Sequence, residues 1–257
     1  MATSTNRARA EQAEWFEQTE YIPFDLAELD ESINYFEFFR RPDKVIHLAW
    51  EGLPNYKSSF HEEINLPRHL AFLSNLIKGG LRDLTVTGTC FEYGMQEGCL
   101  SEEMPALPAN PYAQAKDRLR RELQNLQSER PFFFKHIRLF YMYGKGQSPN
   151  SLLSQLDKAL ASQEAVFNMS GGQQVRDYLP VKKVAEYIVK IVLQSDTTGI
   201  INCCSGIPVT VQEVVEEYLK SINRSIHLNL GYYPYADYEP MRFWGDTTKL
   251  KTILNNE

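Results

Sequence analysis

The sequence predicts an α/β fold in which helices cover both faces of a parallel β-sheet. Short apolar runs alternate along the chain with longer segments of helical periodicity, and this alternation is typical of βαβ units. The helical segments are amphipathic, so each has one apolar face to bury. The 257 residues are 43% apolar and 23% charged, which is enough apolar material for a sizeable core.

Each expected element has a local signal. The segment at residues 44–49 reads KVIHLA, a run that suits a buried strand, and the helix at residues 62–78 ends at the stop signal Gly79-Gly80. The expected strands are residues 21–24, 44–49, 84–89, 132–140 and 200–204. The expected helices are residues 62–78, 111–126, 151–160, 181–193 and 211–219. From Asn223 onward the sequence is richer in Tyr, Pro and Trp, which fits a loop-rich cap over a ligand cleft.

Composition excludes several classes of protein. Twenty-seven basic and 33 acidic residues give a net charge of −6, whereas a nucleic-acid footprint needs a basic surface. No apolar run approaches the ~18 residues of a membrane span, and no signal-peptide core follows Met1. The four cysteines show neither zinc spacing nor a CxxC pair, so we expect no metal site, no disulfide framework and a cytoplasmic location.

The pattern Tyr-x-x-x-Lys occurs three times, beginning at Tyr112, Tyr141 and Tyr178. The second match contains Gly144 in a turn-like stretch and the third contains Pro180, so neither is expected inside a helix. The first match follows a good N-cap and a proline at the first helical position. Local structure therefore favours the Tyr112 match.

On that helix Tyr112 and Lys116 lie on one face. A free phenol has a pKa near ~10, and a nearby ammonium favours the phenolate, which would make the tyrosine an acid–base catalyst. A core tyrosine beside a solvated lysine would give the same spacing. Thr89 ends the expected strand at residues 84–89, and ligands gather at the carboxyl ends of parallel strands. Thr89 could equally just begin a turn.

The chain resembles the extended short-chain dehydrogenase/reductase family, NAD-dependent epimerases, dehydratases and reductases that modify nucleoside-diphosphate sugars. Each motif alone is weak, but they occur in the family's order and cover nearly the whole chain. The matching segments are residues 45–49 (VIHLA), Asn65, and residues 89–94, 110–116, 138–144, 176–181 and 199–206. The resemblance implies a Rossmann-like doubly wound sheet with a small C-terminal substrate-binding cap.

The resemblance also implies roles. Tyr112 would be the acid–base residue, Lys116 would tune it and bind the cofactor ribose, and Thr89 would hydrogen-bond the sugar oxygen that is oxidised or reduced. Arg176 would contact the nucleotide or its phosphates through its planar guanidinium, unless it is an exposed strand-edge arginine. The other implied cofactor contacts are Arg7, Asp25, Leu26, Leu48, Ala49 and Asn65. The other implied substrate contacts are Trp50, Cys90, Tyr141, Tyr233 and Arg242, with residues 231–244 expected to line the sugar pocket.

Two departures from the family pattern concern the reaction. Family dehydratases carry Asp-Glu directly after the catalytic threonine, and Cys90 and Phe91 stand there in this chain. Neither can supply the acid and base for losing water, so dehydration is disfavoured. Tyr141 replaces a family asparagine that touches the substrate phosphate.

A third departure concerns the cofactor. The family opens with a strand and a glycine-rich turn that lets the backbone approach the pyrophosphate, but the first glycine here is Gly52. Residues 1–5 resemble the family's second strand, so the chain is expected to begin one βα unit late. The missing strand is normally central, so two strand edges would lack partners. A misassigned start or a fragment is favoured over a short form that has lost full cofactor binding.

The leading hypothesis is an NAD(P)-dependent enzyme that performs 4-keto reduction or 4-epimerisation of a nucleoside-diphosphate sugar. Residues 4–7 include no acid that would bind a ribose 2′-hydroxyl, which leans towards NADP over NAD. The alternative is a truncated, catalytically impaired or non-catalytic binding protein on the same fold. Residues 1–150 would form the cofactor domain, joined by the strand and helix near 181–219, and residues 151–257 mainly the substrate region. The resemblance further implies a homodimer.

Overall fold

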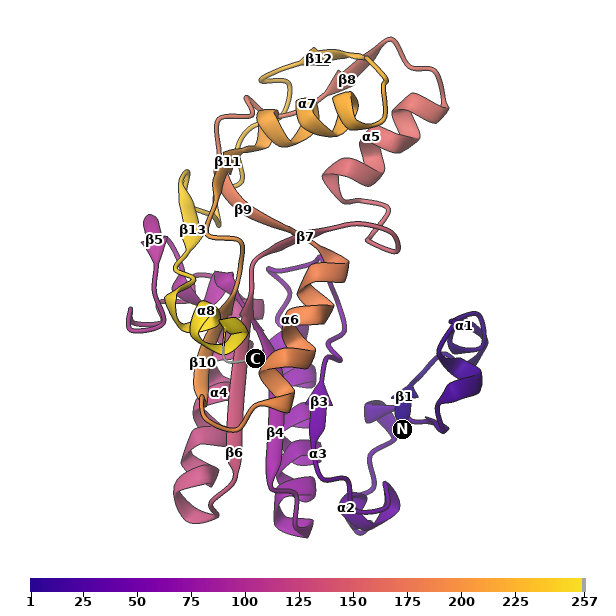
Figure 1. The fold of residues 1–257 in the computed structure, drawn as a ribbon, viewed down its shortest axis with the longest axis vertical. Helices are drawn as coiled ribbons and strands as arrows, with labels where there is room; N and C mark the ends of the chain where they lie inside the picture. Colours follow the sequence, from indigo (N-terminus) through magenta and orange to yellow (C-terminus); the bar gives the residue numbers. More distant parts are fainter. Residues whose placement is uncertain (256–257) are drawn as a thin grey trace.

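The central feature of the fold is a four-stranded parallel sheet, seen in a computed structural model that describes residues 1–255 (Figure 1). The strand order is β10-β6-β4-β3, and every neighbouring pair is parallel. All seven residues of β4 are buried, as expected for a strand covered on both faces. The strands are β3 (Val45–His47), β4 (Asp83–Thr89), β6 (Phe133–Leu139) and β10 (Gly199–Cys203).

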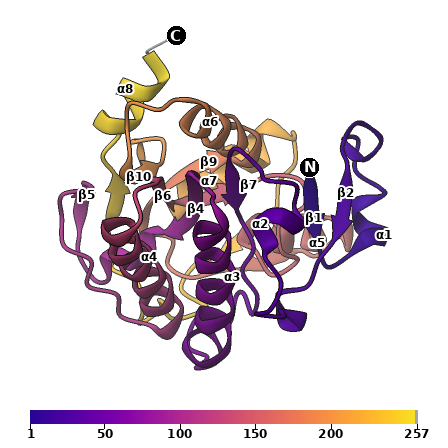
Figure 2. The ribbon, with the colours of Figure 1, turned by 90° about the horizontal axis from the view of Figure 1, so that it is seen from below.

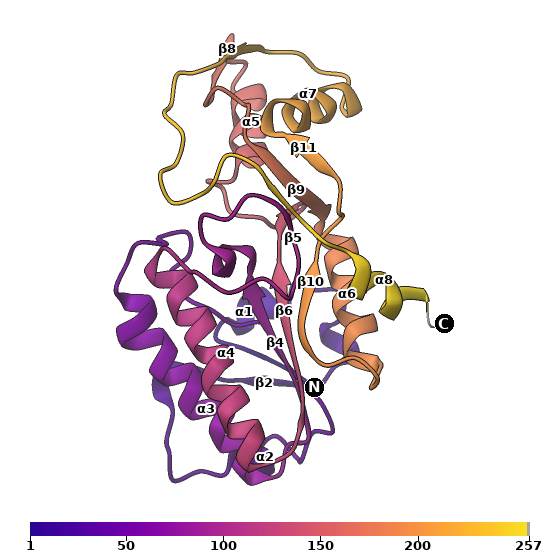
Figure 3. The same cartoon turned by 90° about the vertical axis from the view of Figure 1, so that its left-hand side faces the viewer.

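Helices cover both faces of this sheet (Figures 2 and 3). On one face α3 (Leu66–Gly79) and α4 (Pro111–Glu129) pack with the sheet into an aromatic and aliphatic core. On the other face α6 (Val181–Leu193) and α8 (Thr248–Asn255) bury a second apolar cluster against β6 and β10. The predicted doubly wound α/β fold is therefore confirmed.

A second lobe stands on the carboxyl ends of the sheet strands (Figure 1). Its helices α5 and α7 share a core of their own with β8 and β12. Helix α7 buries Val215 and Leu219 in this core. The elements of this lobe are β7 (Tyr141–Tyr143), α5 (Leu152–Ala161), β8 (Val166–Asn168), β9 (Val175–Pro180), β11 (Pro208–Thr210), α7 (Val211–Ser221) and β12 (His227–Asn229).

The N-terminal segment is not joined to the central sheet. β1 (Ala2–Ser4) and β2 (Tyr21–Pro23) form a separate parallel pair, and β3 is hydrogen-bonded to β4 alone. The predicted interruption between these strands is thus present, and Figure 1 shows β1 set apart from β3. The remaining elements are α1 (Arg7–Ala10), η1 (Phe16–Gln18), η2 (Leu26–Glu28), α2 (Tyr35–Phe38), η3 (His61–Asn65), η4 (Cys90–Tyr93), β5 (Gly98–Leu100) and β13 (Phe243–Gly245).

Candidate active site

The first turn of α4 places Tyr112 and Lys116 at the carboxyl end of the sheet. Asn110 caps the helix, since its side chain accepts a hydrogen bond from the N–H of Ala113 at 2.9 Å, and Pro111 occupies the first turn. Tyr112 and Lys116 are 7% and 2% exposed. The other two Tyr-x-x-x-Lys tyrosines lie on strands, Tyr141 on β7 and Tyr178 on β9, so neither lies in a helix, as the sequence predicted.

Thr89 meets Tyr112 at the end of β4. The Thr89 hydroxyl is close enough to lower the pKa of Tyr112, and it also caps η4 by accepting from the N–H of Phe91 at 3.3 Å. Both residues line a cavity of about 680 Å³, together with Lys116. The cavity lies between the lobes, because its other walls come from β7, the loop at residues 144–151 and the start of α5.

The electrostatics of the pair differ from the expectation. Burial raises the pKa of the Tyr112 hydroxyl, and the nearby Thr89 hydroxyl acts in the opposite direction. Nζ of Lys116 donates to the carbonyl of Thr87 at 2.8 Å and lies 4.1 Å from the centroid of the Trp50 ring. Burial lowers the pKa of Lys116 to about 7.

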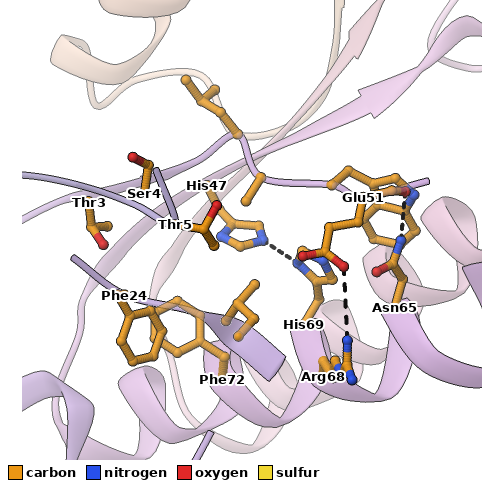
Figure 4. A pocket seen from close by; sticks show the side chains of 14 residues that line it. Thr3, Ser4, Thr5, Phe24, His47, Glu51, Asn65, Arg68, His69 and Phe72 are labelled. Carbon is orange, nitrogen blue, oxygen red and sulfur yellow. Dashed lines mark hydrogen bonds and ion pairs between the residues drawn. The ribbon is translucent and has the colours of Figure 1, made fainter. Parts of the chain in front are cut away.

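A second cavity of about 420 Å³ lies where β1 and β3 fail to pair (Figure 4). The hydroxyl residues at the end of β1 face it, and so do His47 and His69, whose ring nitrogens are 2.6 Å apart. Leu48 and Trp50 line both cavities and therefore form the partition between them. The residues that line this second cavity are Thr3, Ser4, Thr5, Phe24, Leu26, His47, Leu48, Ala49, Trp50, Glu51, Asn65, Arg68, His69 and Phe72.

A dinucleotide fits these residues in part. The ammonium of Lys116 and the hydroxyls of Thr89 and Tyr112 supply donors at one end, and the hydroxyls at the end of β1 supply them at the other. The predicted cofactor residues Leu26, Leu48, Ala49 and Asn65 line the second cavity. No glycine lines that cavity among the residues that the structure describes, so a glycine-rich phosphate cradle is not part of it.

Two predicted cofactor residues lie outside both cavities. Arg7 is exposed and pairs with Glu11 at 2.8 Å within the turn that follows β1. The Asp25 carboxylate accepts from the N–H of Ala27 at 2.8 Å and so caps η2. Both side chains have local partners that sequence spacing could not reveal.

On the substrate side, Trp50, Cys90 and Tyr141 line the larger cavity. Arg176 does not; it is 2% exposed and donates from Nη2 and Nε to Glu239 at 2.8 and 3.0 Å. The Tyr141 hydroxyl also donates to Glu239. The contact of Arg176 with phosphates therefore stays a prediction that would require release of Glu239.

The structure places Tyr233 and Arg242 outside the lining of the cavity, so their contact with the substrate stays a prediction. Tyr233 is 53% exposed, and its N–H donates to the carbonyl of Met169. Arg242 precedes buried Phe243, and strand alternation puts the Arg242 side chain on the exposed face. Of residues 231–244, Tyr238 and Phe243 join the aromatic cluster beside the cavity.

Several cavity residues were not predicted. Leu53, Pro54 and Tyr56 come from the loop after β3, and Phe91 was considered only as a replaced dehydratase residue. The ring of Phe91 lies 5.1 Å from that of Tyr56 and 6.5 Å from that of Tyr112, centroid to centroid. Glu92 does not line the cavity, but its contact with Thr89 could have been predicted, because Thr-x-x-Glu is a capping-box pattern. The structure forms that capping box between Thr89 and Glu92.

No group of three or more His, Cys, Asp or Glu side chains in residues 1–255 is arranged to hold a metal ion. Within the same residues, no helix has the length and apolar character needed to cross a membrane. Cys90, Cys203 and Cys204 are buried free thiols, and Cys99 is exposed.

Comparisons with known proteins identify the fold and the family. The chain is 29% identical over 202 residues to dTDP-6-deoxy-L-talose 4-dehydrogenase (NAD(+)) of Aggregatibacter actinomycetemcomitans, covering 78% of this chain and 74% of the relative. Among solved structures, UDP-glucuronic acid 4-epimerase from Bacillus cereus, in complex with UDP-glucuronic acid and NAD, superposes with a TM-score of 0.76 at 18% identity. That match covers 97% of this chain and 79% of the epimerase.

RMD from Pseudomonas aeruginosa, complexed with NADPH, also matches with a TM-score of 0.76 at 18% identity, covering 97% of this chain and 87% of that protein. These structural matches show that the chain shares its fold with these two proteins. The sequence profile of the NAD dependent epimerase/dehydratase family matches residues 2–204, well over half of the chain. The chain therefore belongs to the NAD dependent epimerase/dehydratase family.

Proposed function

We propose that this protein transfers hydride at C4 of a nucleoside-diphosphate sugar, as a 4-ketoreductase or the reverse 4-dehydrogenase, with 4-epimerisation as the variant that uses the same residues. One observation carries the proposal. Thr89, Tyr112 and Lys116 line one cavity, with Cys90 and Phe91 where a dehydratase needs acids.

In this mechanism Tyr112 moves the proton and Thr89 holds the reacting oxygen. A bound nicotinamide would supply or accept the hydride. The Thr89 hydroxyl donates to the sugar carbonyl, which places that oxygen beside the Tyr112 hydroxyl. Tyr112 gives its proton to the oxygen in reduction and accepts one in oxidation. Lys116, buried and cationic below its pKa, stabilises negative charge that develops on the phenol oxygen.

The surroundings of Phe91 support a 6-deoxyhexose as the sugar. Its ring lies within 6.5 Å of four tyrosine rings, those of Tyr56, Tyr112, Tyr141 and Tyr238, centroid to centroid. An apolar wall of this kind suits a C6 methyl group better than a hydroxymethyl group. The relative that acts on 6-deoxy-L-talose agrees with this choice.

The cofactor is proposed to be NAD(H) or NADP(H). The absence of an acidic residue at the end of β1 supports NADP. The names of the NAD(+)-dependent relative and of the NAD-bound epimerase support NAD. Binding of NAD and of NADP must therefore be compared directly.

Tyr112→Phe tests the catalytic assignment. Losing a general acid lowers turnover by about 10²- to 10⁴-fold, while binding of the nicotinamide, followed by its fluorescence, should remain unchanged. Tyr178→Phe is the matched control, because Tyr178 begins another Tyr-x-x-x-Lys pattern, is partly buried and lines the same cavity. Unchanged turnover in Tyr112→Phe, or an equal loss in both variants, would reject Tyr112 as the acid.

A second candidate function is nucleotide-sugar binding without catalysis. The observation that favours it is the interruption of the sheet between β1 and β3, where the larger part of a dinucleotide would lie. Fluorescence titration with reduced nicotinamide cofactors separates the two candidates. Saturable binding of the cofactor supports the enzyme. No binding at millimolar cofactor would support the non-catalytic binding protein instead.

A further inference from the structure

A charged cluster lies directly beneath the Thr89 backbone. Glu92 on η4 and His136 and Arg138 on β6 all have fully buried side chains. The Glu92 carboxylate accepts from Nε2 of His136 at 2.9 Å and from Nε of Arg138 at 2.8 Å. The Arg138 guanidinium carbon lies 4.2 Å from the centroid of the Tyr93 ring. None of these residues lines either cavity.

The same carboxylate holds the strand end that carries Thr89. Glu92 Oε1 accepts from the N–H of Thr89 at 2.9 Å, which completes a reciprocal capping box with the Thr89 hydroxyl. The preceding residue, Gly88, has no room for a side chain, because a Cβ there would lie 2.3 Å from Glu92 Oε1 and 2.2 Å from His136 Nε2. The cluster is therefore packed against the peptide backbone that presents the Thr89 hydroxyl.

We infer that Glu92 is a positioning residue for the proposed reaction: anchored by Arg138 and His136, its carboxylate fixes Thr89 in the orientation that holds the sugar oxygen beside Tyr112. The inference rests on the proposed function of Thr89 and Tyr112. It goes beyond it, because Glu92 lines neither ligand cavity and acts on the reaction through Thr89 and through its charge.

A buried charge is a costly way to hold a strand end. Replacing a buried ion pair by well-packed apolar residues is often neutral or stabilising, so packing alone gives no reason for three ionisable groups here. A carboxylate has two uses that an apolar group lacks. It accepts a strong charge-assisted bond from the Thr89 N–H, and it brings negative charge close to the catalytic pair on α4.

That charge acts on both members of the pair. Burial opposes ionisation of Glu92, but His136 and Arg138 outweigh it and lower its pKa to about 2, so the carboxylate stays charged. Against the effect of burial, Glu92 raises the pKa of Lys116. It also adds to the rise in the pKa of Tyr112. The ionisable groups that face Glu92 are His136 and Arg138 from β6, Tyr93 from η4, and Tyr112 and Lys116 from α4.

Three variants separate positioning from general support of the fold. Glu92→Gln removes the charge and keeps the shape. Glu92→Asp keeps the charge for Arg138 and shortens the reach to Thr89. Asp83→Asn is the matched control, because Asp83 is also a buried carboxylate on β4, paired with Lys135 on β6 at 3.0 Å, but lies at the opposite end of the strand.

The measurements are kcat and KM for nucleotide-sugar turnover across pH. Glu92→Gln should lower kcat by about 10- to 100-fold, the effect of a displaced catalytic group, with KM changed less than kcat. The alkaline limb of the kcat–pH profile of this variant should move to lower pH, since Lys116 loses its proton more readily without the negative charge of Glu92. Glu92→Asp should lower kcat and leave that limb in place, and Asp83→Asn should change neither.

Equal losses of kcat in Glu92→Gln and Asp83→Asn, or an unmoved pH limb in Glu92→Gln, would overturn the inference. A wild-type protein that turns over no nucleotide sugar would reject the proposed function instead. In that case NMR of the Thr89 amide decides the positioning role. Its proton should shift upfield and exchange faster in Glu92→Gln, but not in Asp83→Asn, and an unchanged Thr89 amide would refute the inference.

Discussion

At the scale of single residues, Lys116 links catalysis to stability. Its ammonium is buried, and burial lowers its pKa to about 7 in the folded protein, against an ordinary value of 10.5. The unfolded lysine keeps its proton up to that ordinary value, so the unfolded state binds more protons between pH 7 and 10.5. The free energy of unfolding must therefore rise with pH across this window.

Lys116→Met should consequently stabilise the ligand-free protein most on the acid side. We expect a gain of more than about 1 kcal/mol at about pH 6, which shrinks as the pH approaches about 9.5. Urea unfolding at the two pH values measures both gains. A gain that is the same at both, or a loss at the lower pH, would contradict the charged buried state of Lys116.

Removing the Glu239 carboxylate should be costly to the second lobe. It accepts two hydrogen bonds from buried Arg176 and one from Tyr141. Glu239→Gln leaves the guanidinium without its counter-charge, so we expect a loss of roughly 3 kcal/mol in the free energy of unfolding. Glu186→Gln breaks an exposed pair with Lys183 and should cost less than about 1 kcal/mol. Similar denaturation midpoints for the two variants would contradict the buried pairing.

At the scale of elements, the N-cap of α4 couples helix stability to the site. Asn110→Ala leaves the N–H of Ala113 without its acceptor and should cost about 1 kcal/mol. Because Tyr112 lies in the first helical turn, kcat should also fall. Thr210→Ala removes the capping box of α7, whose residues line neither cavity, and should cost similar stability with kcat unchanged. Thermal unfolding and kinetics of both variants check this, and a loss of kcat in both would deny the link.

Elements with strong local signals were predictable from sequence. Helix α4 has a cap, a proline and an apolar stripe, and it was placed to within three residues at its end. The same local signals identified Tyr112 and Lys116. Residues 231–244 carry no periodicity, so their contacts depend on distant partners such as Met169 and Arg176. For that reason the positions of Tyr233 and Arg242 outside the cavity lining, and the pairing of Glu239 with Arg176, were not predictable from the sequence.

At the scale of the whole molecule, the interruption of the sheet makes β1 and β2 locally less stable than β4 and β6. β4 and β6 are buried and paired on both sides, whereas β1 and β2 pair only with each other and β1 has no buried residue. Amides with few buried contacts exchange at low opening free energy. Amides of β1 should therefore exchange much faster than those of β4 in hydrogen-exchange mass spectrometry of the ligand-free protein.

The same measurement locates the cofactor. The hydroxyls at the end of β1 and the chain at residues 47–51 line opposite walls of the second cavity, so a ligand that bridges them must slow exchange in both. We expect saturating cofactor to protect residues 1–6 and 45–51 together, and to leave β6, already buried, unchanged. The oxidised forms of NAD and NADP, compared at equal occupancy, reveal which one engages the end of β1. Protection confined to residues 87–116 would restrict binding to the larger cavity and exclude the gap between β1 and β3 as part of the cofactor site.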